Sequence, residues 1–299
     1  MNSGGAPQPL PDYVAVGHIT QDVRDGGLVF GGTVTYASLT ARNLSHHAAI
    51  VTALPDAVLH DVAFADLYRG IEVHALPSEQ VTIFENIYTP AGRIQYLRRH
   101  ARVLDPTKVP PYLLRAPVVH LAPVAQEVPV TLLHHIDRHT LVGVTPQGWM
   151  RRWDETGRVW PERWALAEEI LARADALVFS EEDTGGDMAE AERYVSLARI
   201  AVITRGARGC TVYVRGTRPL DLPAFPTREV DPTGAGDVFA AAFFLKLAER
   251  NDPEIAGVYA NCVASFAVED IGTRGIPTRE QVEARLRAFR STAAARYSW

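Results

Sequence analysis

Short, continuous apolar runs alternate along the chain with longer stretches in which apolar residues recur at helical spacing. The runs are rich in Val, Ile, Leu and Ala, and they predict strands buried on both faces at residues 13–17, 49–54, 118–123, 141–146, 176–180 and 200–206. Helices are predicted at residues 34–43, 57–68, 130–139, 161–174, 187–199, 235–250, 253–269 and 278–290. This alternation is typical of a doubly wound α/β fold, a mostly parallel sheet with helices on both faces.

One section breaks the alternation. Two strand-like runs, residues 81–89 and 93–103, flank a Pro-Ala-Gly turn, which predicts a β-hairpin. We expect it to form a small lid at about residues 80–103, and an ordinary edge hairpin of the main sheet is the alternative. The expected organisation is a flexible tail (residues 1–11), one α/β domain with its lid (12–292) and a C-terminal tail (293–299).

Composition narrows the class of protein without naming a function. Of 299 residues, 47% are apolar and 22% are charged, as in soluble globular domains, and no apolar run approaches the length of a membrane span. The net charge of -5 argues against a nucleic-acid-binding face. The Gly- and Pro-rich first residues lack the basic and apolar segments that are typical of a signal peptide. We therefore expect a cytoplasmic protein with neither a nucleic-acid nor a membrane partner.

Lysine usage excludes one way of binding a nucleotide. Lys108 and Lys246 are the only lysines among 30 Lys and Arg residues. Neither follows the G-x-x-x-x-G-K-[ST] loop in which a lysine reaches the β- and γ-phosphates. A nucleotide, if bound, has to be held by something other than a P-loop.

The strongest chemical signal is DPTGAGD, residues 231–237, followed at once by an apolar helix. Gly234 and Gly236 allow a tight turn, and the amides at the helix start would form a phosphate site together with the helix dipole. Asp237 beside such a site suits a base that accepts a proton from a substrate hydroxyl. A plain capping role is the alternative, because Asp is favoured in the first turn of any helix.

The full string DPTGAGD, with a Phe and small residues behind it, resembles the second signature of the PfkB, or ribokinase-like, carbohydrate kinase family. The resemblance implies that Asp237 is the catalytic base, that the amides of Gly234, Ala235 and Gly236 form the anion hole, and that Thr233 lies near the phosphates. It also implies ATP and Mg²⁺ as cofactors, and a sugar, polyol or nucleoside hydroxyl as acceptor.

The front of the chain fits that family in part. Members carry an acidic residue that binds substrate hydroxyls, and then a Gly-Gly pair before a helix. Here these are Asp22, Gly31 and Gly32. Tyr36 or its neighbours stand where the family has Asn, so this signature does not name the sugar. A Gln-Gly-x-x-Arg loop, similar to that of some members, adds Gln147 and Arg151 as implied substrate contacts.

Three further segments resemble the family's nucleotide and metal elements. One is a strand, Gly-x-x-Gly turn and strand near the phosphates, and another lines the adenine pocket. The implied ATP contacts are Thr204, Arg205, Gly206, Gly209, Asn261, Ser265 and Val268. The Asn-x-x-Glu element is replaced by Ser180-Glu-Glu-Asp, which leaves Glu182 and Asp183 to organise the metal through water.

Several segments, among them ITQD and SFAVEDIG, resemble myo-inositol kinase-like members of the family. We expect a monomer or homodimer. A non-catalytic sugar or nucleotide sensor on the same fold is the alternative, because the helix that follows Gly31 and Gly32 and the Ser180 element both depart from the family's sequence pattern. The presence of Asp237, the implied catalytic base, argues against a sensor. A Rossmann oxidoreductase is set aside because no GxGxxG follows the first strand.

Overall fold

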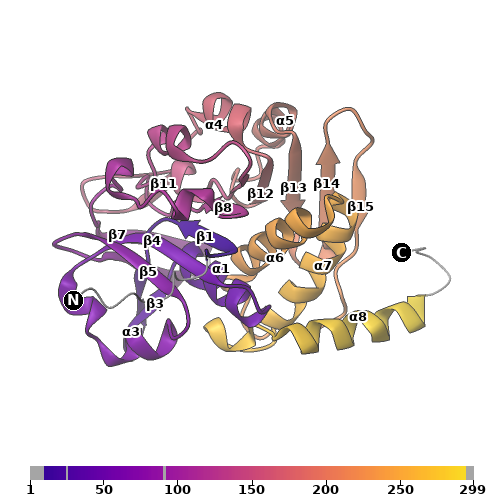
Figure 1. The fold of residues 1–299 in the computed structure, drawn as a ribbon, viewed down its shortest axis with the longest axis horizontal. Coiled ribbons are helices and arrows are strands. Elements are labelled where there is room, and N and C mark those ends of the chain that lie inside the picture. The colour runs from indigo at the N-terminus through magenta and orange to yellow at the C-terminus, as the bar shows by residue number, and fades with distance from the viewer. Residues whose placement is uncertain (1–9, 25, 90–91, 294–299) are drawn as a thin grey trace, which may run out of the picture.

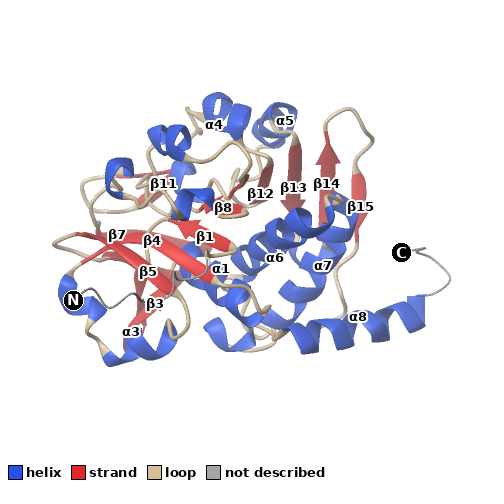
Figure 2. Ribbon diagram, in the orientation of Figure 1, coloured by secondary structure: helices blue, strands red, loops and turns tan. Residues whose placement is uncertain are grey.

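The computed structural model describes residues 10–24, 26–89 and 92–293. A nine-stranded sheet runs through the middle of the molecule, with helices on both sides (Figures 1 and 2). In spatial order its strands are β15 (Leu220–Leu222), β14 (Cys210–Val214), β13 (Ile200–Thr204), β12 (Ala176–Ser180), β9 (Leu141–Val144), β8 (Val118–Leu121), β1 (Tyr13–Val16), β4 (Ala48–Leu54) and β5 (Glu72–Pro77). The pairs from β13 to β5 are parallel, and β14 is antiparallel to both its neighbours.

The apolar runs are explained by burial on both faces of this sheet. Tyr13 and Ala15 of β1 pack into one core, while Val14 and Val16 pack into the other, as the alternation of side chains along a strand requires. One core is covered by α1 (Thr33–Asn43), α6 (Ala235–Arg250) and α7 (Pro253–Ala267), and the other by α4 (Ala167–Arg173) and α5 (Met188–Leu197). The predicted doubly wound α/β architecture is therefore confirmed.

The lid is larger than the predicted hairpin. It is a four-stranded sheet in the order β3 (Gly27–Gly31), β2 (Thr20–Arg24), β6 (Thr82–Thr89) and β7 (Gly92–Arg99). The hairpin β6–β7 is as predicted, although Pro90 and Ala91 of its turn lie outside the described residues. The run TQDVR escaped prediction as a strand because only Thr20 is buried and the rest of β2 carries polar or exposed residues.

A further hairpin continues the lid and was not predicted. Strands β10 (Arg151–Trp153) and β11 (Val159–Pro161) pair antiparallel, and a bridge between Tyr96 and Arg158 joins them to β7. The amide of Leu97 also donates to the carbonyl of Gly157 at 2.8 Å. The first residue of the predicted helix 161–174, Pro161, belongs to this hairpin instead, and α4 begins only at Ala167.

Two other predicted helices differ in the structure. Residues 57–68 form α2 (Asp56–Leu59) and α3 (Val62–Leu67), because Asp61 caps the second one by accepting the amide of Phe64 at 3.1 Å. Residues 130–139 contain a 3₁₀ helix, Val130–His135, and the chain is extended at Ile136. Leu132, Leu133 and Ile136 are buried at a spacing that mimics an α-helix, which explains the wrong prediction. The last helix, α8 (Arg279–Ala293), is close to its prediction.

The fold brings the ends of several strands and helices to one edge of the main sheet. The carboxyl ends of β1, β9, β12 and β13 and the N-termini of α1 and α6 lie there, next to the lid. Figure 1 shows the lid strands β3 and β7 at the left of the view. Ligands of open α/β sheets bind at such edges. No helix within the described residues is both long and apolar enough to cross a bilayer.

Candidate active site

A cavity of about 1410 Å³ opens between this edge and the lid. The predicted site residues that line it are Asp22, Gly32, Gln147, Arg151, Glu182, Asp183, Thr204, Arg205, Gly206, Gly209, Thr233, Gly234, Ala235, Gly236, Asp237, Asn261, Ser265 and Val268. Gly31 is not part of the wall, but a Cβ atom on it would lie 2.7 Å from a carboxylate oxygen of Asp22. The structure therefore gathers the predicted residues, which are scattered over most of the sequence, around one space.

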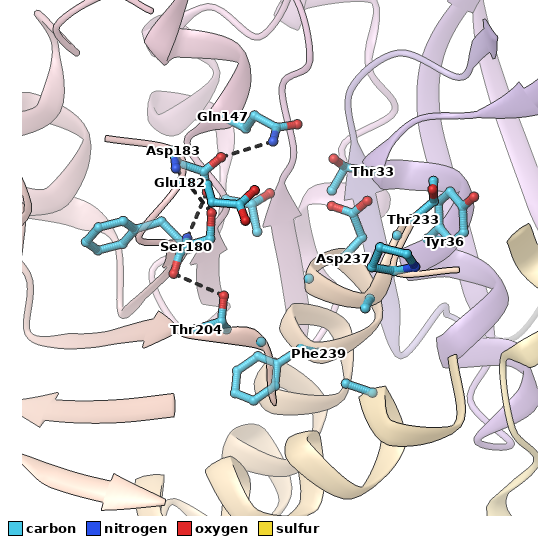
Figure 3. Close-up of a pocket in the computed structure, with 18 of the residues that line it drawn as sticks. Thr33, Tyr36, Gln147, Ser180, Glu182, Asp183, Thr204, Thr233, Asp237 and Phe239 are labelled. Atoms are coloured by element: carbon cyan, nitrogen blue, oxygen red, sulfur yellow. Dashed lines mark hydrogen bonds between the residues drawn. The ribbon is translucent and has the colours of Figure 1, made fainter. Parts of the chain in front are cut away.

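Asp237 lies in the first turn of α6, at the floor of this cavity. In Figure 3 its carboxylate faces Thr33, which comes from the N-terminus of α1. Burial raises the pKa of Asp237 to about 6, a hydrogen bond from Thr33 lowers it, the carboxylate of Asp183 raises it, and Arg151 lowers it. A carboxylate with this pKa is ionised at pH 7 and still holds a proton far better than a surface Asp, which suits a general base.

Gly234 shapes the start of α6. Its φ angle of 78° is left-handed, and a Cβ atom here would lie 2.2 Å from the ring of buried Tyr36. The amide of Ala235 donates to the carbonyl of Pro232 at 3.2 Å, whereas the described residues offer no acceptor to the amides of Gly236 and Asp237. The amide of Gly234 likewise has no acceptor among the described residues, so the amides of Gly234, Gly236 and Asp237 are available to an anion.

Asp231 holds the loop in front of the helix. One of its carboxylate oxygens accepts the amide of Thr233 at 3.0 Å, and the other accepts the amide of Gly272 at 3.1 Å. These bonds lower the pKa of Asp231 against the effect of burial, which raises it. The first Asp of DPTGAGD is therefore a structural residue that orients the loop, while the last one faces the cavity.

Asp183 is fixed by three donors. One oxygen accepts the amide and the hydroxyl of Ser180, both at 2.8 Å, and the other accepts the side-chain amide of Gln147 at 3.0 Å (Figure 3). Ser180, which departs from the family pattern, thus supports the carboxylate at the end of its element. Gln147 lines the cavity but gives an amide proton to Asp183. Glu182 is exposed beside it.

The turn after β13 and the end of α7 form the opposite wall. Gly209 has a φ angle of 84°, and Arg205 pairs with Asp221 while its Nε atom has no partner among the described residues. Asn261 donates its side-chain amide to the carbonyl of Pro223 at 3.2 Å. Ser265 donates to the carbonyl of Cys262 at 2.7 Å. Both polar groups predicted for adenine are thus bound within the protein.

The lid lines the remaining wall. Thr20, Asp22 and Arg24 alternate along β2, so that all three reach the cavity. Asn86 and Gln95 reach it from β6 and β7, and the side-chain amide of Gln95 donates to the Asn86 carbonyl at 2.9 Å. This wall offers a carboxylate, amides and hydroxyls, which suits an acceptor rich in hydroxyl groups.

Glu127 is a residue that the sequence analysis missed. It is fully buried, and its carboxylate accepts the amides of His18 (2.8 Å), Val124 (2.9 and 3.0 Å) and Ala125 (2.7 Å). These bonds tie together the loops that follow β1 and β8, next to the cavity. An acidic residue within the apolar run LAPVAQEV was the available signal.

Replacing Glu127 by Gln is expected to destabilise the fold by about 2–4 kcal/mol. The new side-chain NH₂ group cannot accept, so buried amides that now bond to the carboxylate would be left without a partner. Urea unfolding followed by circular dichroism measures this loss. Glu155→Gln, at an exposed loop position, is the matched control and should be neutral. Equal stability of both variants would contradict this role of Glu127.

Comparison with known proteins finds similar sequences and similar folds among carbohydrate and nucleoside kinases. Residues 165–279 match the model of the pfkB family carbohydrate kinases. The chain is 28% identical to the cytidine kinase of Thermococcus kodakarensis over 78% of this chain and 87% of that protein. It is 46% identical to the ribokinase of Bacillus subtilis, but that alignment spans only 27% of this chain and 28% of the ribokinase.

Among solved structures, the fold is similar to that of a pyrophosphate-dependent kinase in the ribokinase family, complexed with a pyrophosphate analog and myo-inositol. The TM-score is 0.77 at 23% identity, covering 91% of this chain and 99% of that one. At such identity the likeness concerns the fold. The family model, the sequence relatives and the shared fold point the same way: residues 165–279 match the pfkB family of carbohydrate kinases, and the chain as a whole has the ribokinase-like fold.

Proposed function

We propose that the protein transfers the γ-phosphoryl group of ATP to a hydroxyl of a sugar, an inositol-like polyol or a nucleoside, with Asp237 as general base. One observation carries the proposal. Asp237, with a pKa of about 6, shares its cavity with the free amides at the start of α6 and with the polar wall of the lid. A base, an anion site and a hydroxyl-binding wall are what in-line phosphoryl transfer needs.

In the proposed reaction, Asp237 takes the proton of the acceptor hydroxyl while the alcohol oxygen forms a bond to the γ-phosphorus. The bond between that phosphorus and the β–γ bridging oxygen breaks, and ADP leaves with the electron pair. The amides of Gly236 and Asp237, together with the N-terminus of α6, stabilise the charge that develops on the transferred group. Asp237 then returns its proton to solvent.

The acidic residues near the donor wall fit Mg²⁺ held through water. The described residues contain no group of three His, Cys, Asp or Glu that could hold a metal ion directly. Mg²⁺ keeps several waters and is bound through one or two carboxylates with substrate phosphates, which matches Asp183 and the exposed Glu182. When bound, the ion would neutralise phosphate charge, and the bonds from Ser180 and Gln147 would keep Asp183 oriented toward its water shell.

Asp22 is proposed to hold the acceptor by accepting bonds from two of its hydroxyls. Asp22→Asn is expected to raise the KM of the acceptor by about 10- to 100-fold, since a hydrogen bond to a charged group contributes roughly 1.5–3 kcal/mol. The KM of the donor should stay within twofold of the wild type. Steady-state kinetics with each substrate varied in turn measures both. A change confined to the donor KM would contradict the assignment.

Pyrophosphate is a second candidate donor. Asn261 and Ser265 give their side-chain protons to carbonyls of the protein, so neither side chain donates a hydrogen bond to a nucleobase at the positions expected for adenine. Product formation with ATP, GTP and pyrophosphate, each with a panel of inositols, pentoses, hexoses and nucleosides, tests donor and acceptor together. Binding without a phosphorylated product from any pair would instead favour the non-catalytic sensor.

A further inference from the structure

Three polar side chains form a line of hydrogen bonds that begins in the core and ends at the cavity. The hydroxyl oxygen of Tyr13, in β1, lies 2.6 Å from Nδ1 of His120, in β8. Nε2 of His120 lies 2.9 Å from the hydroxyl oxygen of Thr145, the residue that follows β9. Tyr13 and His120 are fully buried, whereas Thr145 is 8% exposed and lines the cavity. The inside of the main sheet is therefore connected to the candidate active site.

The burial of Tyr13 and His120 fixes the direction of both bonds. Burial, and then the charge of Asp237, raise the pKa of Tyr13 well above its ordinary value, so the hydroxyl keeps its proton. Among the described residues His120 is its only hydrogen-bond partner, and a buried O–H group without an acceptor is costly, so Tyr13 donates to Nδ1. Burial lowers the pKa of His120 to about 3, so the neutral ring has one N–H group, on Nε2. His120 thus donates to the oxygen of Thr145.

The proton of the Thr145 hydroxyl consequently needs an acceptor other than His120. Within the part of the chain that the structure describes, this hydroxyl has no further partner, and its open side is the cavity. Gln147, two residues later, donates to Asp183, which places Thr145 in the wall proposed for the metal and the phosphates. The Thr145 proton is therefore directed into this part of the cavity.

We infer that the Thr145 hydroxyl is a fixed hydrogen-bond donor to a phosphate oxygen of the phosphoryl donor, and that Tyr13 and His120 are positioning residues that keep it so. The inference rests on the proposed function, which brings a phosphoryl group into this cavity. Phosphate oxygens accept hydrogen bonds, and the carboxylates of Asp183 and Asp237 would repel them. A neutral hydroxyl with its proton directed into the cavity offsets this repulsion together with the amides at the start of α6.

The test compares Thr145→Val, Thr145→Ser and Thr140→Val. Valine keeps the shape of threonine without the hydroxyl, and serine restores the hydroxyl. Thr140 directly precedes β9, at the other end of the same strand, and is the matched control. It is 4% exposed, does not line the cavity, and donates to the carbonyl of Ala116 at 2.9 Å. Melting temperatures establish that each variant is folded.

Thr145→Val is expected to lower kcat/KM for the phosphoryl donor by about 10- to 100-fold, the size of one hydrogen bond to a charged group. The KM of the acceptor should change little. Thr145→Ser should recover most of the loss, and Thr140→Val should show none. Wild-type donor kinetics in folded Thr145→Val, or an equal loss in Thr140→Val, would overturn the inference.

The position of the proton on His120 is a readout that a purely structural role would not fix. The ¹⁵N spectrum of the imidazole ring, identified by its loss in His120→Gln, should show the proton on Nε2 and a bare Nδ1 between pH 5 and pH 9. A proton on Nδ1 would overturn the inference, because Thr145 would then donate to His120 instead of to a ligand.

Donor binding separates this inference from the proposed function. Isothermal titration calorimetry with ATP and with pyrophosphate, each with Mg²⁺ and without acceptor, should show binding to Thr145→Val that is weaker than wild type on the order of 10-fold. Equal affinities of the two proteins for both donors would overturn the inference. If the wild type bound a donor but formed no phosphorylated product, weaker binding by Thr145→Val would still support the role of Thr145, and only the proposed function would fail.

Discussion

Asp237→Asn is expected to slow turnover by roughly 10²- to 10⁴-fold while donor and acceptor still bind, the range typical for loss of a general base. The asparagine keeps the shape of the side chain at the start of α6 but cannot take up a proton at neutral pH. Rates of product formation at saturating substrates measure the effect, and isothermal titration calorimetry checks that binding persists.

The same variant has a predictable effect on stability, which serves as its folding control. Burial raises the folded-state pKa of Asp237 to about 6, above the ordinary value of the unfolded chain. The fold therefore favours the protonated form, and this contribution is complete below about pH 4 and is lost as the pH rises through 6. Asp237→Asn should melt at the same or a higher temperature than the wild type at pH 8, and this difference should shrink toward pH 4. Loss of activity together with a much lower melting temperature would point to misfolding instead.

Gly234→Ala is expected to damage both the fold and the reaction. The new methyl group would meet the ring of buried Tyr36, and the left-handed backbone at this position is unfavourable for alanine. Together the clash and the strain should destabilise the protein by about 2–4 kcal/mol. A shift of the amides that follow should reduce kcat by about 10²- to 10³-fold, as losing an oxyanion-hole donor does.

Gly236→Ala is the matched control for the stability part of this prediction. A Cβ atom on Gly236 would have no atom within 4 Å, and its backbone is helical. Alanine there should leave the melting temperature unchanged or raise it, because alanine is favoured over glycine in helices. Chemical unfolding of both variants gives the comparison. An equal loss of unfolding free energy in Gly234→Ala and Gly236→Ala would show that the close approach to Tyr36 does not require glycine at position 234.

The parts of the fold that the sequence predicts well are those whose signal is local. The helix at residues 235–250 is observed with the same bounds, because DPTGAGD ends an extended segment and an uninterrupted apolar run follows. The six predicted strands are all present, since burial on both faces of a parallel sheet requires continuous apolar runs. The strands of the lid beyond the hairpin carry no such run, and β2 was missed for that reason.

The parts of the site that the sequence cannot supply depend on contacts between distant segments. Thr33 and Asp237 are brought together by the packing of α1 against α6, and no spacing along the chain reports that contact. The same holds for Glu127, whose partners include the amide of His18. Gln147 was predicted to contact substrate, but its bond to Asp183 becomes visible only when the ends of β9 and β12 lie side by side.

The role of Asp237 is tested most directly by measuring kcat/KM for phosphorylated acceptor between pH 5 and pH 9 for the wild type and Asp237→Asn side by side. We predict a wild-type rate that rises with pH through about 6 and then levels, because the base must be ionised, and a variant that is slower by orders of magnitude and lacks this limb. A variant with the wild-type rate and the wild-type limb would contradict the account.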